Sequence, residues 1–100
     1  MDWQVVLSDF FISDLKEIVD FLVKHAGAEF ASRMGHELID RALEAGRQPF
    51  AGQPVKSHSN TRKILHHRYL IYYDINPEKG RIEVLRIWHS ARDPKTLRLR

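Results

Sequence analysis

The sequence predicts an α+β domain in which a short N-terminal strand and a helical hairpin precede a three-stranded antiparallel sheet segment. Three observations lead to this fold class. Apolar residues recur at helical spacing in two successive stretches, residues 11–22 and 31–45. Two strand-like runs near the C-terminus flank Asn76-Pro77-Glu78-Lys79-Gly80, whose Pro and Gly are typical of a hairpin turn. Because 100 residues suffice for one hydrophobic core, we expect residues 1–100 to form a single domain.

A strand and a first helix are predicted at the N-terminus. Residues 1–7 alternate with the period of a short strand. Ser8 or Asp9 then suits the N-cap of a helix, and Gly27 is expected to end that helix. The apolar stripe of the helix consists of Phe11, Leu15, Ile18 and Leu22.

A second helix is predicted from about Ala28 to Ala45, and Gly46 ends it. Its apolar residues again line one side. Neither helix can bury its stripe alone, so the two are expected to form an antiparallel hairpin packed on a sheet or on each other.

The C-terminal half predicts a linker followed by three strands. Residues 47–60 are rich in Pro, Gly, Ser and Gln, a composition typical of a connector. The strands are expected at about residues 62–66, 69–75 and 81–89. Consecutive strands with short turns indicate a mostly antiparallel sheet.

Composition excludes several classes of protein. Hydrophobic residues make up 43% and charged residues 29% of the chain, which is typical of a soluble globular protein. No apolar run is long enough to cross a bilayer, and the N-terminus lacks the layout of a signal peptide, so we expect a cytoplasmic protein without membrane contact. The absence of cysteine excludes disulfides, thiolate metal sites and thiol catalysis, and no cofactor is expected.

Charge is distributed unevenly along the chain. Residues 1–55 carry five Lys or Arg against nine Asp or Glu, a balance of −4, whereas residues 56–100 carry eleven against four, a balance of +7. The sum is the net charge of +3. This separation favours an anionic partner for the C-terminal half, either nucleic acid or an acidic protein, over a merely solubilising surface.

Individual side chains of the strands give further expectations. His66 and His67 are adjacent, so in a strand their rings diverge, and we expect no metal site there. Arg86 lies in an apolar strand and is expected to be exposed, because an unpaired buried charge is very costly. His89 is expected to hydrogen-bond at the end of its strand, and Arg92-Asp93 to form an ion pair or a turn.

Aromatic residues of the strands are interpreted as core. Stacking of Trp88 on nucleic-acid bases is the alternative. Aromatics at strand spacing more often pack in the interior, so Tyr69, Ile71 and Tyr73 are expected to lie under the helices.

The order of elements and four local phrases resemble the RelE/ParE superfamily of toxins from type II toxin–antitoxin modules. The matching phrases are Ser13-Asp14-Leu15-Lys16-Glu17-Ile18, the helix exit from Leu43 to Gly52, Tyr69-Leu70-Ile71-Tyr72-Tyr73, and the segment from Ile82 to Asp93. The last phrase is the most specific. A terminal strand that closes in a histidine and then an Arg-Asp pair is more similar to the ParE branch than to the RelE branch.

The resemblance implies a cytoplasmic growth inhibitor from a plasmid stabilisation module, held in check by a cognate antitoxin. It also implies one of two targets. DNA gyrase would be poisoned by binding alone, whereas ribosome-bound mRNA would be cut by an endoribonuclease. A homodimer or a heterotetramer with the antitoxin would suit such a module. A basic interaction module without toxicity is the remaining alternative.

The sequence favours the binding inhibitor over the nuclease. RelE-like nucleases place an arginine after the aromatic that opens this strand, but here Leu70 follows Tyr69, and Arg68 lies one residue earlier. The tail from Pro94 to Arg100 also lacks the terminal tyrosine or histidine of many nucleases in the group. If the chain were a nuclease, His89, Arg68 and Arg92 would be the candidates, with Tyr72, Tyr73 or Glu83 as further proton donors or acceptors. The expected surface for target or antitoxin consists of Lys63, Arg68, Arg86, His89, Arg92, Lys95, Arg98 and Arg100.

Overall fold

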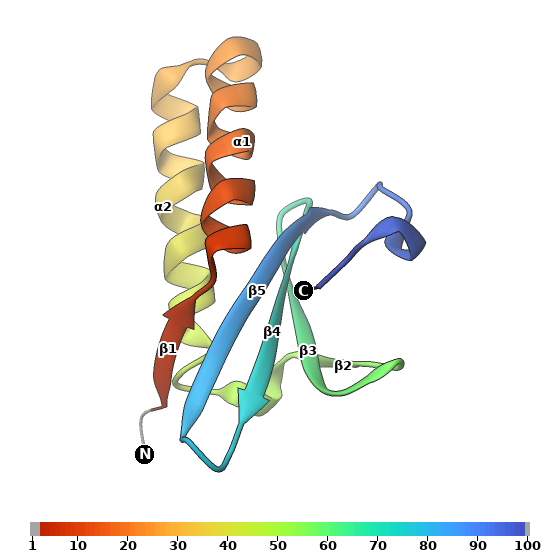
Figure 1. The fold of residues 1–100 in the computed structure, drawn as a ribbon. Coiled ribbons are helices and arrows are strands. Elements are labelled where there is room, and N and C mark those ends of the chain that lie inside the picture. Colours follow the sequence, from red (N-terminus) through yellow and green to blue (C-terminus); the bar gives the residue numbers. More distant parts are fainter. Residues whose placement is uncertain (1–2, 100) are drawn as a thin grey trace.

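A computed structural model describes residues 3–99 and confirms the α+β class (Figure 1). The elements in chain order are β1 (Gln4–Leu7), α1 (Asp9–Ala26), α2 (Ala28–Glu44), η1 (Pro49–Ala51), β2 (Gln53–Val55), β3 (His58–His66), β4 (Tyr69–Asn76), β5 (Arg81–His89) and η2 (Pro94–Thr96). None of the helices in this described part is long and apolar enough to cross a membrane.

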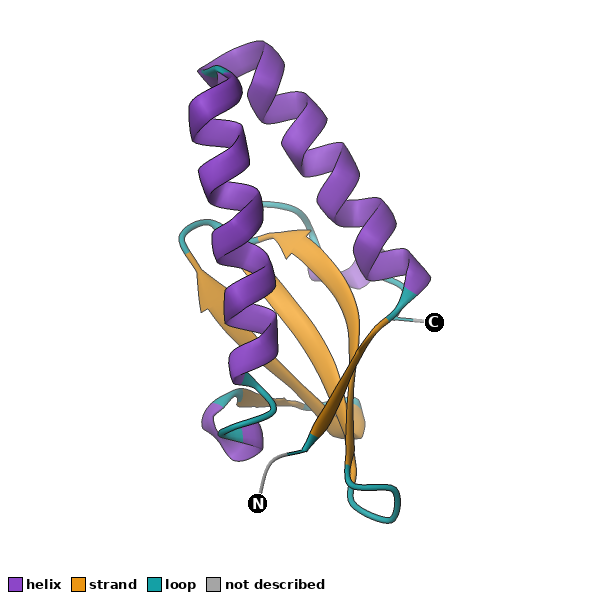
Figure 2. Cartoon of the chain, turned by 90° about the vertical axis from the view of Figure 1, so that its left-hand side faces the viewer, coloured by secondary structure: helices purple, strands orange, loops and turns teal. Residues whose placement is uncertain are grey.

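The strands form one five-stranded sheet in the order β1-β5-β4-β3-β2. β1 pairs with β5 in parallel, and every other pair is antiparallel. The two helices lie side by side against one face of this twisted sheet (Figure 2). The chain from β1 through the hairpin therefore returns to the sheet beside its own last strand.

Local sequence signals set both ends of the helical hairpin. Ser8 is the N-cap of α1, and its side-chain oxygen accepts a hydrogen bond of 3.0 Å from the backbone N–H of Phe11. Gly27 ends α1 and precedes α2 with φ of 95°, a conformation that side chains disfavour. α2 ends at Glu44, one residue before the expected end, and Ala45 caps it.

The prediction that residues 47–60 form a plain linker is wrong. This segment contains η1, β2 and the first residues of β3, which begins at His58. Pro54 argued against a strand because it has no N–H group, but β2 is an edge strand in which that group is not needed. The Tyr73 hydroxyl donates a hydrogen bond to Pro49 O (2.6 Å) and accepts one from Gly52 N (3.2 Å). A side chain from β4 thus holds this segment on the core.

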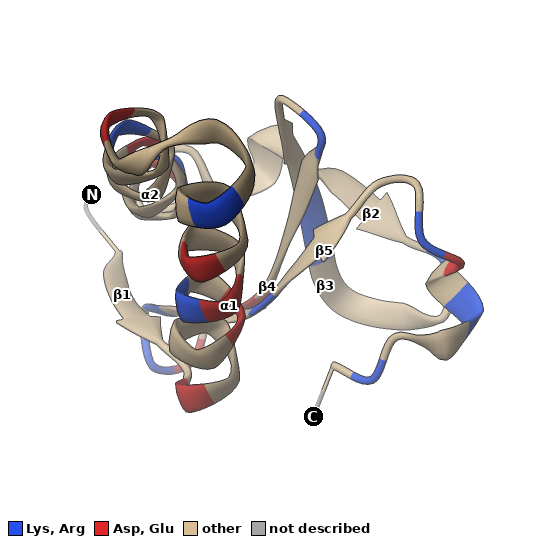
Figure 3. Cartoon of the chain, turned by 90° about the horizontal axis from the view of Figure 1, so that it is seen from above, with Lys and Arg blue, Asp and Glu red and all other residues tan. Residues whose placement is uncertain are grey.

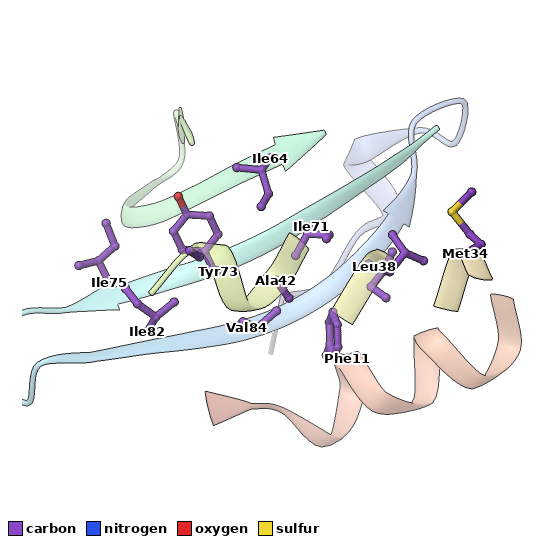
Figure 4. Close-up of a cluster of buried hydrophobic side chains, with 12 residues drawn as sticks. Phe11, Met34, Leu38, Ala42, Ile64, Ile71, Tyr73, Ile75, Ile82 and Val84 are labelled. Carbon is purple, nitrogen blue, oxygen red and sulfur yellow. The ribbon is translucent and has the colours of Figure 1, made fainter. Parts of the chain in front are cut away.

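The two faces of the sheet carry separate hydrophobic clusters. The larger cluster lies between the helices and the sheet and includes Phe11, Leu38, Ile71 and Tyr73, with Tyr69 packed at its edge (Figure 4). The expected burial of Tyr69, Ile71 and Tyr73 under the helices is confirmed. The smaller cluster covers the opposite face, where the C-terminal segment contributes its apolar side chains. Its buried members are Tyr72, Leu85, Trp88 and Leu99.

Candidate binding groove

A groove of about 790 Å³ opens between the helical hairpin and the ends of β4 and β5 where the β3–β4 turn lies. The joined ends of α1 and α2 extend beyond the sheet, so part of their apolar stripe has no strand to cover it (Figure 1). The helices supply apolar side chains, and the turn and strand ends supply polar ones. The helical lining residues are Glu17, Ile18, Phe21, Leu22, Phe30 and Met34, and those of the sheet side are His67, Arg68, Tyr69, His89 and Arg92.

Two phenylalanines make the groove unusually apolar. Phe21 retains 58% and Phe30 36% of its accessible surface. Exposed aromatic rings beside a concave surface are typical of a docking site, because an isolated domain gains nothing by leaving them in water. The helical side of the groove is therefore suited to the apolar face of a partner.

Two arginines at the sheet side have no acidic partner. Arg68 lies in the turn between β3 and β4 and is exposed, as is Arg92 just after β5. Among residues 3–99, neither forms a salt bridge. The Arg92 guanidinium instead lies 4.0 Å above the centre of the Trp88 ring, which fixes its position without cancelling its charge.

His89 and Tyr69 connect the two arginines. His89 Nδ1 accepts a hydrogen bond of 3.1 Å from the backbone N–H of Ala91, which confirms the expected role at the strand end. The rings of His89 and Tyr69 meet edge to face with centres 5.5 Å apart. Burial raises the pKa of the Tyr69 hydroxyl, and the nearby Arg68 charge lowers it by a smaller amount. The hydroxyl is therefore neutral at physiological pH.

Arg86 behaves differently from the groove arginines, and the expectation that it is exposed is wrong. Its side chain is only 20% accessible, and Nε and Nη2 donate to the Asp14 carboxylate at 2.7 and 2.9 Å. Asp14 also accepts from Ile87 N at 3.0 Å, beyond the point where β1 ceases to cover β5. Hydrogen bonding to Asp14 raises the pKa of Arg86, against the opposing effect of desolvation. This arginine joins α1 to the sheet and is not a free cation.

The remaining predicted residues lie away from the groove. Lys63 lines a separate depression beside β2, Lys95 lies in η2, and the carbonyl of Arg98 accepts from Arg86 Nη1 at 2.8 Å. Arg100 lies outside the described residues. Each helix carries four acidic residues, so most acids lie on the hairpin, across from the basic strands and C-terminal segment (Figure 3). The predicted cationic set is therefore divided, and only Arg68, His89 and Arg92 share the groove.

Comparison with known proteins places this architecture. A family model described as the ParE toxin of the type II toxin–antitoxin system parDE matches residues 5–94. The chain belongs to the ParE toxin family. It is a toxin of a type II toxin–antitoxin module within the RelE/ParE superfamily. No curated protein matches the sequence significantly.

Solved structures share the fold of this ParE-family toxin at low sequence identity. The chromosomal ParDE system of P. aeruginosa superimposes with a TM-score of 0.78 at 19% identity, covering 87% of this chain and 95% of the other. The RelBE2 complex of Mycobacterium tuberculosis gives 0.70 at 18%, covering 89% and 99%. An arginine double mutant of E. coli RelE in the free state gives 0.67 at 13%, covering 91% and 86%.

The RelE-like proton-transfer candidates of this ParE-family chain do not meet. Tyr72 is 3% accessible within the smaller cluster, and the Tyr73 hydroxyl is engaged with Pro49 and Gly52. Glu83 lies six residues before His89 on β5, a separation of roughly 20 Å along an extended strand. Only His89 of the four reaches the groove.

Arg68 and Leu70 point to different sides of this family member, as expected from their spacing. Arg68 lines the groove on the helical side, whereas Leu70 packs with the cluster on the opposite face. Arg92 and Asp93 do not pair with each other among the described residues. Asp93 caps η2 by accepting from Lys95 N at 2.9 Å.

Sequence reasoning missed the apolar half of the groove. Phe21 and Phe30 lie beside the stripes that were assigned to the core, and their aromatic character was the only available signal. His67 was also missed as a groove residue, because its position depends on backbone geometry. His67 has φ of 53°, which turns its ring away from the direction a strand would give.

The predicted divergence of His66 and His67 is wrong for this same reason. Their ring centres lie 4.6 Å apart at 86°, and both Nε2 atoms face the Glu37 carboxylate on α2.

Proposed function

We propose that this toxin arrests growth by binding its target, with DNA gyrase as the favoured target, and that a cognate antitoxin occupies the groove to neutralise it. The observation that carries the antitoxin proposal is the groove itself, in which exposed aromatic rings face two arginines without acidic partners. The finer proposal about gyrase rests on the absence of assembled proton-transfer groups among the described residues.

The groove fits an amphipathic, acidic segment of an antitoxin. Such a segment would lay apolar side chains on Phe21 and Phe30 and place carboxylates beside Arg68 and Arg92. Apolar burial would supply affinity, and the charges would supply orientation and a fast association rate. The P. aeruginosa and M. tuberculosis structures are described as a toxin–antitoxin system and a toxin–antitoxin complex, which supports a partner of this kind.

Binding without catalysis is supported by the geometry of the candidate groups. Cleavage of RNA by attack of a 2′-hydroxyl needs one group to take a proton, another to give one, and cations at the phosphate. Arg68 and Arg92 supply the cations, but His89 is the only candidate proton-transfer group in the groove among residues 3–99. An mRNA endoribonuclease is therefore the second candidate, and a basic module without toxicity is the third.

Purified gyrase and translated mRNA separate these candidates. We expect the toxin to inhibit DNA supercoiling by gyrase in proportion to its concentration, and the antitoxin to reverse that inhibition. Primer extension on translated transcripts should show no new ends within codons. Cleavage within codons would instead support the endoribonuclease, and normal growth at confirmed expression without antitoxin would support the third candidate.

The assembly and location follow from the same proposal. A gyrase inhibitor acts in the cytoplasm, and a plasmid stabilisation module requires the toxin and antitoxin to form a complex there. We expect a homodimer or a heterotetramer with the antitoxin. Light scattering after co-expression measures the stoichiometry.

A further inference from the structure

The geometry points to a transition-metal site formed by Glu37, His66 and His67, with Zn²⁺ as the ion it fits best. These residues come from two parts of the chain that are far apart in sequence: Glu37 from the middle of α2, and the histidines from the end of β3 and the turn after it. One carboxylate oxygen and the two imidazole Nε2 atoms all lie within 4.8 Å of one another. Two imidazoles and a carboxylate are a donor set that zinc accepts.

The backbone builds this cluster. β3 ends at His66, and the left-handed conformation of His67 (φ of 53°) turns its ring back beside that of its neighbour. The distances from Glu37 Oε1 are 3.6 Å to His66 Nε2 and 3.8 Å to His67 Nε2. Ligand atoms about 2.0 Å from a tetrahedral zinc ion lie roughly 3.3 Å apart, so small side-chain rotations would complete the coordination.

The state without metal leaves a polar atom unsatisfied. His66 Nε2 is buried and has no hydrogen-bond partner, because 3.6 Å is too long for a hydrogen bond to the carboxylate. Buried polar atoms without partners are rare and destabilising, and each one calls for an explanation. A metal ion between the three side chains would supply the missing partner, with water completing the coordination.

A metal at this position would act on the groove. His67 lines the groove and directly precedes Arg68, so coordination would fix the turn that presents this arginine. It would also tie α2 to the β3–β4 turn. The site is independent of the proposed target and requires only the described fold.

Calorimetry with zinc chloride on the tag-free full chain tests the proposal. We expect one zinc ion to bind per chain and to raise the melting temperature. His66→Gln and Glu37→Gln should each weaken binding by about 100-fold or more, because even the partners of ligands contribute 10- to 100-fold. His36→Gln and His58→Gln are matched controls, since His36 contacts Ser32 and His58 contacts Ser57, outside the cluster. Both controls should bind zinc as the parent chain does.

A measurement on the unmodified chain guards against variants that do not fold. In NMR spectra, zinc should shift the ring signals of His66 and His67 and leave those of His58 in place. Cobalt should give the visible absorption of a tetrahedral site that loses intensity on addition of zinc. Absence of saturable binding, binding that survives both Gln substitutions, or equal shifts at His58 would overturn the proposal.

Discussion

Arg86 and the groove arginines lie near each other in sequence, yet the molecule treats their charges in opposite ways. Arg86 is mostly buried and meets the Asp14 carboxylate through two hydrogen bonds. Arg68 and Arg92 are exposed and form no salt bridge among the described residues. The fold neutralises the cation that joins α1 to β5 and leaves uncompensated those that border the apolar groove. A basic C-terminal half is therefore two things: part scaffold and part binding surface.

The largest effect is expected on the scaffold side of this comparison. Asp14→Ala should lower the free energy of unfolding by about 3 kcal/mol, because it leaves the Arg86 charge and the Ile87 N–H without their acceptor. Urea unfolding followed by circular dichroism measures the change. A loss below about 0.5 kcal/mol, the size expected for an exposed pair, would show that Arg86 is not structural.

On the binding side, Arg68→Glu combined with Arg92→Glu should weaken antitoxin binding by about 2 kcal/mol, roughly 30-fold, because it places like charges against an acidic segment. Unfolding should change by less than about 0.5 kcal/mol, since both side chains are exposed. Titration calorimetry with the antitoxin encoded beside the toxin gene gives the affinity. Lys79→Glu, in the turn at the other end of the sheet, is the matched control and should bind normally.

An uncharged contact of the scaffold gives a smaller effect. Tyr73→Phe should lower stability by about 1 to 2 kcal/mol, because Pro49 O and Gly52 N lose their buried partner. Thermal unfolding should show the loss without any effect of salt. Unchanged stability would mean that the segment 47–55 does not depend on this hydroxyl.

The same tyrosine predicts a dependence on alkaline pH. Burial raises the pKa of Tyr73 above its ordinary value, against smaller effects of the Gly52 hydrogen bond and nearby arginines. Because the folded pKa exceeds the unfolded one, this contribution to stability is complete below about pH 10 and is lost as the pH rises further. Stability should therefore fall less steeply above that pH in Tyr73→Phe than in the parent chain. Equal slopes would contradict the assignment.

The smallest effect is expected for an exposed ion pair on α2. Arg41 and Glu44 are joined at 2.9 Å, but their side chains are 36% and 57% accessible. Glu44→Gln should change stability by less than about 0.5 kcal/mol. A loss as large as that of Asp14→Ala would remove the distinction between buried and exposed pairs on which the comparison rests.

The sequence predicted the regular elements well because their signals are local. Ser8, Gly27 and the turn before Gly80 set boundaries through capping and backbone conformation, and the apolar periods identified the two helices. It did not predict β2, since a proline on an edge strand cannot be recognised until the sheet order is known. It also did not separate Arg86 from the groove arginines. The partner of Arg86 lies 72 residues away, and only the packing of α1 on β5 brings the two together.

Hydrogen exchange of the toxin with and without its antitoxin tests the groove most directly. The account predicts added protection in the joined ends of α1 and α2, in the turn that carries His67 and Arg68, and at residues 89–92. Protection confined to the β2 side around Lys63, with the groove segments exchanging as in the free toxin, would contradict it.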